Sequence, residues 1–279
     1  MTEQDYYQWQ HDYWADHASE WEKWAEIVAP QAEGFNRPLI DAAGITAGGK
    51  VLDLACGAGE PSLTAAATVG ADGHVTASDY SAEMLAATKR RAAANGVGNM
   101  SFERADMQDL PFADNSFDHV ISRFGFMYTE APDVTASEIL RVLRPGGRVA
   151  LMVWGRMEDN TVLSVALNAA NSVLGVLDES AAEHPGAYAE EGSLTSIFDA
   201  AGFDNAEESD IRFAPSIPAN IPFWQPIVGM NLGKATQSMS KDELATLDEK
   251  IRDAHAPYLS EGKYQLNAHI RVISAQKPQ

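Results

Sequence analysis

Three carboxylates at the ends of short apolar runs, together with one glycine-rich turn, are the residues best suited to bind a ligand. Asp53 lies within VLDLACGAG, residues 51–59, where the glycines let the backbone turn sharply and pass close to a bound group. Asp79 and Asp106 come at the ends of the next two apolar runs. Carboxylate oxygens act only as acceptors, so one such group can accept hydrogen bonds from both hydroxyls of a ribose. The set therefore predicts a site for a nucleoside-containing cofactor.

The glycine spacing differs from that of the common dinucleotide and triphosphate sites. Ala55 stands where the dinucleotide fingerprint has its first glycine, and Asp53 lies inside the motif. The Gly-Lys-Ser/Thr of a phosphate-binding loop is missing as well. An NAD-dependent dehydrogenase is therefore the least favoured hypothesis.

Strands that alternate with helices position these side chains. The apolar runs predict strands over 50–55, 73–78, 100–104, 117–122 and 148–154. The segments between them predict helices over 61–69, 81–94 and 133–143. Such alternation is typical of an α/β protein with a parallel sheet covered on both faces. The carboxyl ends of parallel strands meet at one edge, so we expect the three carboxylates to converge there.

The pattern is weaker beyond residue 154. It predicts a helix over 193–201, a strand over 203–213, a helix over 240–254 and a last strand over 264–275. Four prolines within 215–226 predict a connection and not the interior of an element. We divide the chain into an aromatic N-terminal helical lid (1–36), an α/β core that binds the cofactor (37–154) and a remainder with further core strands and inserted helices (155–279).

Composition restricts the partners. Acidic residues outnumber basic ones by 40 to 20, which gives the 279-residue chain a formal net charge of −20. This balance argues against a nucleic-acid partner and against an anionic membrane surface. The single cysteine, Cys56, excludes an intrachain disulfide and a metal site built from cysteines. The sequence has neither a signal-peptide pattern nor an apolar run of membrane-spanning length, so we expect a cytoplasmic protein.

Residues 51–154 resemble the catalytic domain of class I S-adenosylmethionine-dependent methyltransferases. The segment 51–59 is similar to their first motif, and DYSAEML at 79–85 resembles the acidic second motif. Asp106 and Met107, with the segments that follow them, resemble the third and fourth motifs, and RVLRPGGR at 141–148 resembles the approach to the fifth strand. The small-molecule branch, which includes the quinone C-methyltransferases and methyltransferase type 11, is the most similar in pattern.

The resemblance implies a Rossmann-like seven-stranded sheet with an antiparallel last strand, a helical N-terminal lid and helices inserted over the carboxyl edge. It also implies S-adenosylmethionine as the cofactor, S-adenosylhomocysteine as its product, and no metal. The methionine part would lie against Asp53 and the backbone of three loop residues, Ala55, Gly57 and Gly59. Arg123 would lie beside the cofactor, whereas Glu60 has no role that the pattern assigns.

The adenosine part has its own set of matched positions. The resemblance implies that Asp79 holds the ribose hydroxyls and that Tyr80 or Met84 packs near the adenosine. Asp106 and Met107 would recognise the adenine. Asp79 as a charge at a helix N-terminus and Asp106 as a surface turn are the purely structural alternatives.

Methyl transfer is an in-line displacement in which a positive sulfonium leaves as a neutral thioether, so the leaving group needs no acid. Catalysis then depends mostly on placing the nucleophile about 3–3.5 Å away with water excluded. A base matters only if the acceptor is a hydroxyl, an acidic carbon or a protonated amine. His184 is the candidate base, and Tyr128 is a candidate for the acceptor wall, with packing as its alternative. We expect a structural role for His269 and a solvated position for His255.

Aromatic residues are dense near the N-terminus, where four of the six tryptophans lie: Trp9, Trp14, Trp21 and Trp24. They form either a lid over the cofactor, with Tyr13 and Trp14 at the site, or a helix that docks its rings onto the core. We favour docking for Trp21 and Trp24. Phe223, Trp224 and Met230 suit an apolar or aromatic acceptor.

Three functional hypotheses remain. The first is transfer of a methyl group to a small molecule such as a quinone, a phenol or an amine. The second, an RNA methyltransferase, is disfavoured by the net charge. The third is a protein that binds the cofactor without transferring a methyl group or uses it for other chemistry. The acceptor, the methylated atom, the use of a base and the oligomeric state are not predicted.

Overall fold

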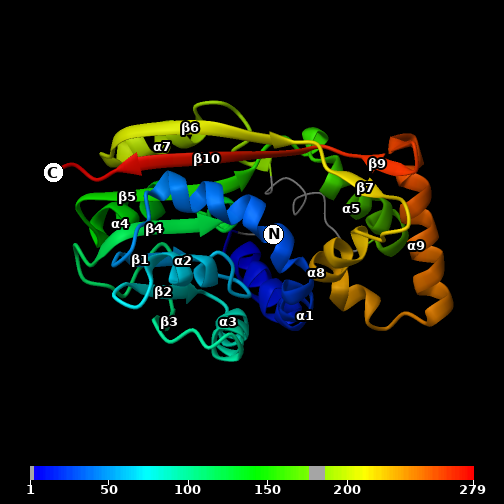
Figure 1. The fold of residues 1–279 in the computed structure, drawn as a ribbon, viewed down its shortest axis with the longest axis horizontal. Helices are drawn as coiled ribbons and strands as arrows, with labels where there is room; N and C mark the ends of the chain where they lie inside the picture. The colour runs from blue at the N-terminus through cyan, green and yellow to red at the C-terminus, as the bar shows by residue number, and fades with distance from the viewer. Residues whose placement is uncertain (1–2, 176–185) are drawn as a thin grey trace.

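The fold is organised around one large sheet of seven strands (Figure 1). The computed structural model describes residues 3–175 and 186–279, with side chains from Asp12 onward except that of Gln31. The strands run in the order β3 (Met100–Arg104), β2 (His74–Asp79), β1 (Lys50–Leu54), β4 (Phe117–Arg123), β5 (Leu143–Trp154), β10 (Ala268–Gln276) and β6 (Asp204–Phe213). β1 to β5 are parallel, and β10 is antiparallel to both of its neighbours. The predicted fold class is therefore confirmed.

Helices cover both faces of this sheet. The first face carries α4 (Pro132–Val142) and α7 (Ser193–Ala201), and the second carries α2 (Ser62–Val69) and the end of α1 (Glu3–Ala43). α3 (Ala82–Ala94) packs on β2 and β3. The central strands are buried on both sides: Leu52 packs toward α4, whereas Val51 packs toward α1 and α2. This is why these strands are continuous apolar runs in the sequence.

A helical cap lies beyond the carboxyl edge of the sheet, at the right of Figure 1. It consists of α5 (Thr161–Leu174), α8 (Trp224–Thr236), α9 (Lys241–His255) and a small sheet of β7 (Ser216–Pro218), β9 (Lys263–Gln265) and β8 (Leu259–Ser260). The cap has its own apolar core, which includes Leu232, Leu247 and Leu266. Two short 3-10 helices, η1 (Phe126–Tyr128) and η2 (Met157–Asp159), follow β4 and β5, and a third, η4 (Ala256–Tyr258), follows α9.

Two predictions for the C-terminal part are wrong. The segment 215–226 is more than a connection, because it contains β7 and the start of α8. Its prolines are tolerated because Pro218 lies in an edge strand and Pro226 lies in the first turn of a helix, where N–H groups need no intrahelical partner. The last predicted strand is two strands, β9 and β10.

His255 is buried in the cap, not solvated as predicted. Its side chain is stacked on Trp224 with ring centroids 5.4 Å apart, and Phe223 and Tyr264 contact it edge-on. Its Nδ1 is 2.7 Å from the carbonyl oxygen of Ile251. Burial lowers the pKa of this imidazole, so the cap core contains a neutral ring.

α1 joins the cap to the core. On the cap side, α8 presents two glycines to α1, and a Cβ at Gly229 would lie 2.0 Å from Nε1 of Trp24. The Tyr13 hydroxyl donates a 2.5 Å hydrogen bond to the carbonyl oxygen of Asn231, also on α8. On the core side, Arg91 of α3 donates to Glu26 of α1 at 2.7 Å. α1 is therefore attached both to the cap and to the core.

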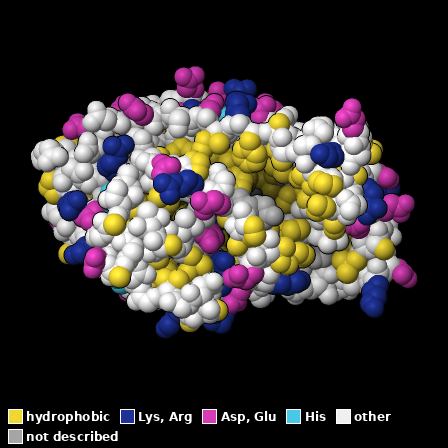
Figure 2. All heavy atoms as spheres, in the orientation of Figure 1, with side chains coloured by type: hydrophobic (Ala, Val, Ile, Leu, Met, Phe, Trp, Pro, Cys, Tyr) yellow, Lys and Arg dark blue, Asp and Glu magenta, His cyan; other side chains and the backbone are white. Residues whose placement is uncertain are grey.

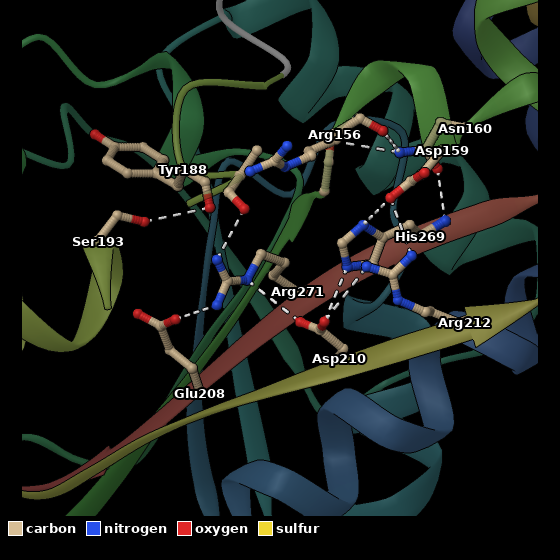
Figure 3. Close-up of polar contacts among 12 residues, drawn as sticks. Arg156, Asp159, Asn160, Tyr188, Ser193, Glu208, Asp210, Arg212, His269 and Arg271 are labelled. Atoms are coloured by element: carbon tan, nitrogen blue, oxygen red, sulfur yellow. Dashed lines mark hydrogen bonds and ion pairs between the residues drawn. The ribbon is translucent and has the colours of Figure 1, made fainter. Parts of the chain in front are cut away.

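A cluster of charged side chains ties β6, β10 and η2 together at the sheet edge (Figure 3). The two nitrogens of His269 lie 3.2 Å from Asp210 and 3.4 Å from Asp159. Next to it, Arg271 pairs with Glu208 and with Asp210. The side chains of His269 and Arg271 are both buried. Removing one of the carboxylates would leave a buried basic group without its partner, which would lower the stability of the fold.

Candidate active site

A cavity of about 810 Å³ lies between the carboxyl edge of the sheet, α1 and the cap. In Figure 2 the hollow is lined by hydrophobic side chains and opens between the two parts of the molecule. Residues that follow β1, β2, β3 and β4 form one end of it. Residues of α5, β6, β7 and α8 form the other end. After the sequence-based predictions, we call these the cofactor end and the acceptor end.

The glycine-rich turn after β1 presents backbone to the cofactor end. Ala55, Gly57 and Gly59 have φ angles of 53°, 54° and 109°, all in the left-handed region. The turn packs closely against the loop after β4, because a Cβ on Gly125 would lie 2.5 Å from the Cβ of Ala55. Ala55 and Gly57 line the cavity, whereas Gly59 does not. A ligand can therefore approach the backbone at 55–58 without meeting a large side chain.

Asp79 is fixed at the end of β2 by backbone donors. One carboxylate oxygen accepts a hydrogen bond from the N–H of Gly57, and the other accepts one from Ser81, both at 2.9 Å. Burial raises the pKa of Asp79 to about 6, although these hydrogen bonds favour the ionised form. The carboxylate lines the cavity, and the N–H of Tyr80 is a third backbone donor that favours its ionised form.

The predicted adenosine positions lie together around the same end. Asp106 and Met107 line the cavity after β3, and Asp106 accepts a 2.8 Å hydrogen bond from the N–H of Gln108. Tyr80 and Met84 line it too, Tyr80 with an exposed ring under the Arg104 guanidinium and Met84 buried on α3. These side chains place one carboxylate and three flat or flexible apolar groups around a common space.

Asp53 lies behind the wall of the cavity and not in it. Its side chain is fully buried, and one oxygen accepts a hydrogen bond from the Ser62 hydroxyl. The other oxygen has no hydrogen-bond partner among the described residues. Burial raises the pKa of Asp53 to about 7. The structure thus does not bring Asp53 to the surface that the sequence-based prediction assigned to the methionine part.

Two opposite charges flank the turn in its place. Glu60 and Arg123 both line the cavity, and both bind the side-chain amide of Asn36 on α1. Asn36 donates to Glu60 at 2.8 Å and accepts from Arg123 at 2.7 Å. The sequence singled out Arg123 but not Asn36, because nothing in the local pattern of α1 shows which core residues it meets.

The other candidate residues are only partly brought together. Tyr128 and Trp14 line the cavity with their rings in edge contact at 5.1 Å, and Trp21 lines it as well. Tyr13 does not: it docks α1 on α8. Trp24 is docked, but on Gly229 of α8 in the cap and not on the core as predicted. His184 lies outside the described residues.

The acceptor end is apolar. Of the residues predicted for it, Phe223 and Met230 line the cavity, but Trp224 is buried in the cap and donates to Asp248 at 2.7 Å. The wall from α5 to α8 also includes Leu163, Leu167, Ile211, Phe213, Ile217 and Ile227. Among the described residues of this wall, none carries a charge, and Asn231 is the polar one.

The described part of the chain lacks two further features. None of its helices combines the length and apolar character that a membrane span requires. It also contains no group of three or more His, Cys, Asp or Glu side chains arranged to hold a metal ion.

The sheet order, with its antiparallel strand β10, defines a Rossmann-like fold. Comparison with known proteins agrees: a methyltransferase domain family matches residues 51–147. The chain is 34% identical over 190 residues to the ubiquinone/menaquinone biosynthesis C-methyltransferase UbiE of Cellvibrio japonicus, covering 62% of this chain and 74% of that protein. The chain belongs to the class I S-adenosylmethionine-dependent methyltransferases, the family that its motifs predicted.

Other similarities cover a smaller share of the known protein. An uncharacterized protein of Mycobacterium tuberculosis is 43% identical over 129 residues, which are 46% of this chain but only 44% of that protein. The match therefore spans less than half of that relative. The phosphoethanolamine N-methyltransferase 2 of Haemonchus contortus, solved with phosphomonomethylethanolamine and S-adenosylhomocysteine, has a TM-score of 0.56 at 20% identity and covers 88% of this chain and 52% of its own. That likeness supports the fold alone.

Proposed function

We propose that this protein transfers a methyl group from S-adenosylmethionine to a small, uncharged and mainly apolar acceptor. The observation that carries the proposal is one continuous cavity with a carboxylate-bearing turn region at one end and an apolar wall at the other. Membership of the methyltransferase family and the similarity to a quinone C-methyltransferase support it. The net charge of −20 favours a small molecule over RNA.

The residues of the cofactor end fit this cofactor. Asp79 is held by backbone N–H groups and lines the cavity, where it would accept hydrogen bonds from the ribose hydroxyls. Asp106 offers a carboxylate for the amino group of adenine, with Met107 beside it. The bare backbone at 55–58 accommodates the atoms that join adenosine to the amino acid. When bound, the cofactor supplies a methyl group on a positively charged sulfur.

The chain's own contribution is placement and exclusion of water. The apolar wall favours an acceptor without charge, because burying an unpaired charge there would be costly. Alignment of the nucleophile and removal of water supply most of the rate enhancement that such a displacement needs. Trp14 contacts Trp21 and Tyr128 edge-on, and these three rings form a bulky part of the cavity wall that would help to exclude water. If the acceptor needs a base, Tyr128 and His184 remain the proposed candidates.

The test is binding followed by turnover. Purified protein is titrated with S-adenosylhomocysteine by calorimetry and then incubated with S-adenosylmethionine and a panel of quinols, phenols and amines. We expect binding, and acceptor-dependent release of S-adenosylhomocysteine with an equimolar methylated product by mass spectrometry. Binding without turnover on any acceptor would favour a cofactor-binding protein of other chemistry, and retention on heparin at physiological salt would favour RNA. Absence of binding would overturn the proposal.

A further inference from the structure

We propose that Glu60 and Arg123, held by Asn36, bind the two charges of the cofactor's amino-acid end: Glu60 the ammonium group and Arg123 the carboxylate. The inference rests on the proposed function and assigns a role that the sequence motifs left open for Glu60. It replaces Asp53, which lies behind the wall, as the acid that meets the cofactor.

The two charges flank the turn at the required place. Glu60 directly follows Gly59 and precedes α2, whereas Arg123 ends β4, the strand that pairs with β1. Both side chains line the cavity beside the backbone of 55–58. Chain order and strand pairing place both next to the glycine-rich turn, so the amino-acid end of a cofactor bound at that turn would meet them.

Glu60 and Arg123 do not pair with each other. No atoms of the two charged groups lie within 4.0 Å, and the Asn36 amide holds them apart by donating to Glu60 and accepting from Arg123. Asn36 is 1% exposed, so this spacing is fixed by a buried side chain. Two partly buried opposite charges, kept separate at a cavity wall, are complementary to a ligand whose ammonium and carboxylate share one carbon.

Each charge keeps capacity for a ligand. One Glu60 oxygen accepts from Asn36 and Thr64, while the other is no closer than 4.0 Å to the Arg91 guanidinium. Arg123 uses one guanidinium nitrogen for Asn36, and its fork can still form a bidentate pair with a carboxylate. Burial lowers the pKa of the Arg123 guanidinium, whereas the charges of Glu60 and then Asp53 favour its ionised form.

A structural role is the competing explanation, because Asn36 also ties α1 to the core. The two explanations differ in which ligands they affect. We therefore titrate three probes by calorimetry: S-adenosylhomocysteine, decarboxylated S-adenosylmethionine, which lacks the carboxylate, and 5′-methylthioadenosine, which lacks the whole amino-acid group. If a substitution only loosens the attachment of α1 to the core, all three probes should bind more weakly. If it removes a charge that contacts the cofactor, only the probes that carry the opposite charge should bind more weakly.

Arg123→Met is expected to weaken S-adenosylhomocysteine binding at least about tenfold, the size of a lost charge-assisted contact, and to change the other two probes less than about twofold. Glu60→Gln keeps the shape and is expected to weaken S-adenosylhomocysteine and the decarboxylated probe about tenfold but not 5′-methylthioadenosine. Retained 5′-methylthioadenosine binding shows at once that each variant is folded.

Arg90→Met is the matched control, because Arg90 binds Glu22 of α1 but does not line the cavity. It should change no probe by more than about twofold. Equal loss of all three probes in the Glu60 and Arg123 variants, or unchanged S-adenosylhomocysteine binding, would overturn the inference while the proposed function stands. If the wild type binds none of the three probes, the proposed function fails as well.

Discussion

The two ends of the cavity are built in different ways. The cofactor end comes from short loops that directly follow four parallel strands, and its polar groups are set by backbone contacts such as those from Gly57 and Ser81 to Asp79. The acceptor end comes from four elements spread between residues 161 and 231, and its surface is apolar packing. The first end is therefore fixed by local geometry. The second depends on how the cap docks, with α1 as the connection.

The largest expected effect is at the cofactor end. Asp79→Ala removes the carboxylate that would accept two ribose hydroxyls, so we expect S-adenosylhomocysteine to bind about a hundredfold more weakly. Calorimetry measures the affinity, and circular dichroism checks the fold. Binding of an uncharged apolar dye such as Nile red at the other end should be unchanged. An unchanged cofactor affinity would remove Asp79 from the proposed site.

The packing of α1 on α8, which connects the two ends, can be disrupted by a substitution at Gly229. Alanine usually stabilises a helix interior by about 1 kcal/mol relative to glycine, but here its Cβ would meet Trp24 at 2.0 Å. We expect Gly229→Ala to lower the free energy of unfolding by about 2 kcal/mol in urea titrations. Gly34→Ala in α1, where no atom lies within 4 Å of the new Cβ, should raise it by up to about 1 kcal/mol. Equal effects of the two variants would contradict the close α1–α8 packing.

The pH dependence of cofactor binding should come mainly from Asp79. Burial raises the pKa of Asp79 to about 6, and only the ionised form can accept two ribose hydroxyls without giving up an oxygen to its own proton. Affinity for S-adenosylhomocysteine is therefore retained above pH 7 and lost as the pH falls through 6, to about a tenth at pH 5. Calorimetry at pH 5, 6 and 8 measures this slope. In Asp79→Asn the slope over this range should disappear, and a slope that persists would assign it to another group.

The smallest effect is expected at the acceptor end. Ile227→Asn places an amide in the apolar wall, where an unpaired polar group is unfavourable. We expect binding of the apolar dye to weaken about fivefold, with S-adenosylhomocysteine affinity unchanged. Leu259→Asn is the control, because Leu259 is exposed and does not line the cavity. A loss of cofactor affinity in the Ile227 variant would show that the two ends are not independent.

The sequence predicted best the features that depend on neighbours along the chain. Ser81 caps α3 by accepting from the N–H of Met84, and Ser240 and Glu243 form the capping box that their spacing indicates. The five strands of the core follow their apolar runs. Tertiary packing decided the rest: His255 lies on a mostly polar helix, yet three aromatic rings from elsewhere in the cap bury it.

By itself, the sequence determined the parallel sheet, its glycine-rich turn and the carboxylates at the ends of β2 and β3, because hydrogen bonding and burial along one strand specify them locally. Only the tertiary structure decided that Asp53 lies behind the wall, that Asn36 separates Glu60 from Arg123, and which apolar residues line the other end of the cavity. Those properties come from contacts between segments far apart in the chain. Their geometry depends on how α1 and the cap pack against the sheet, which no local pattern encodes.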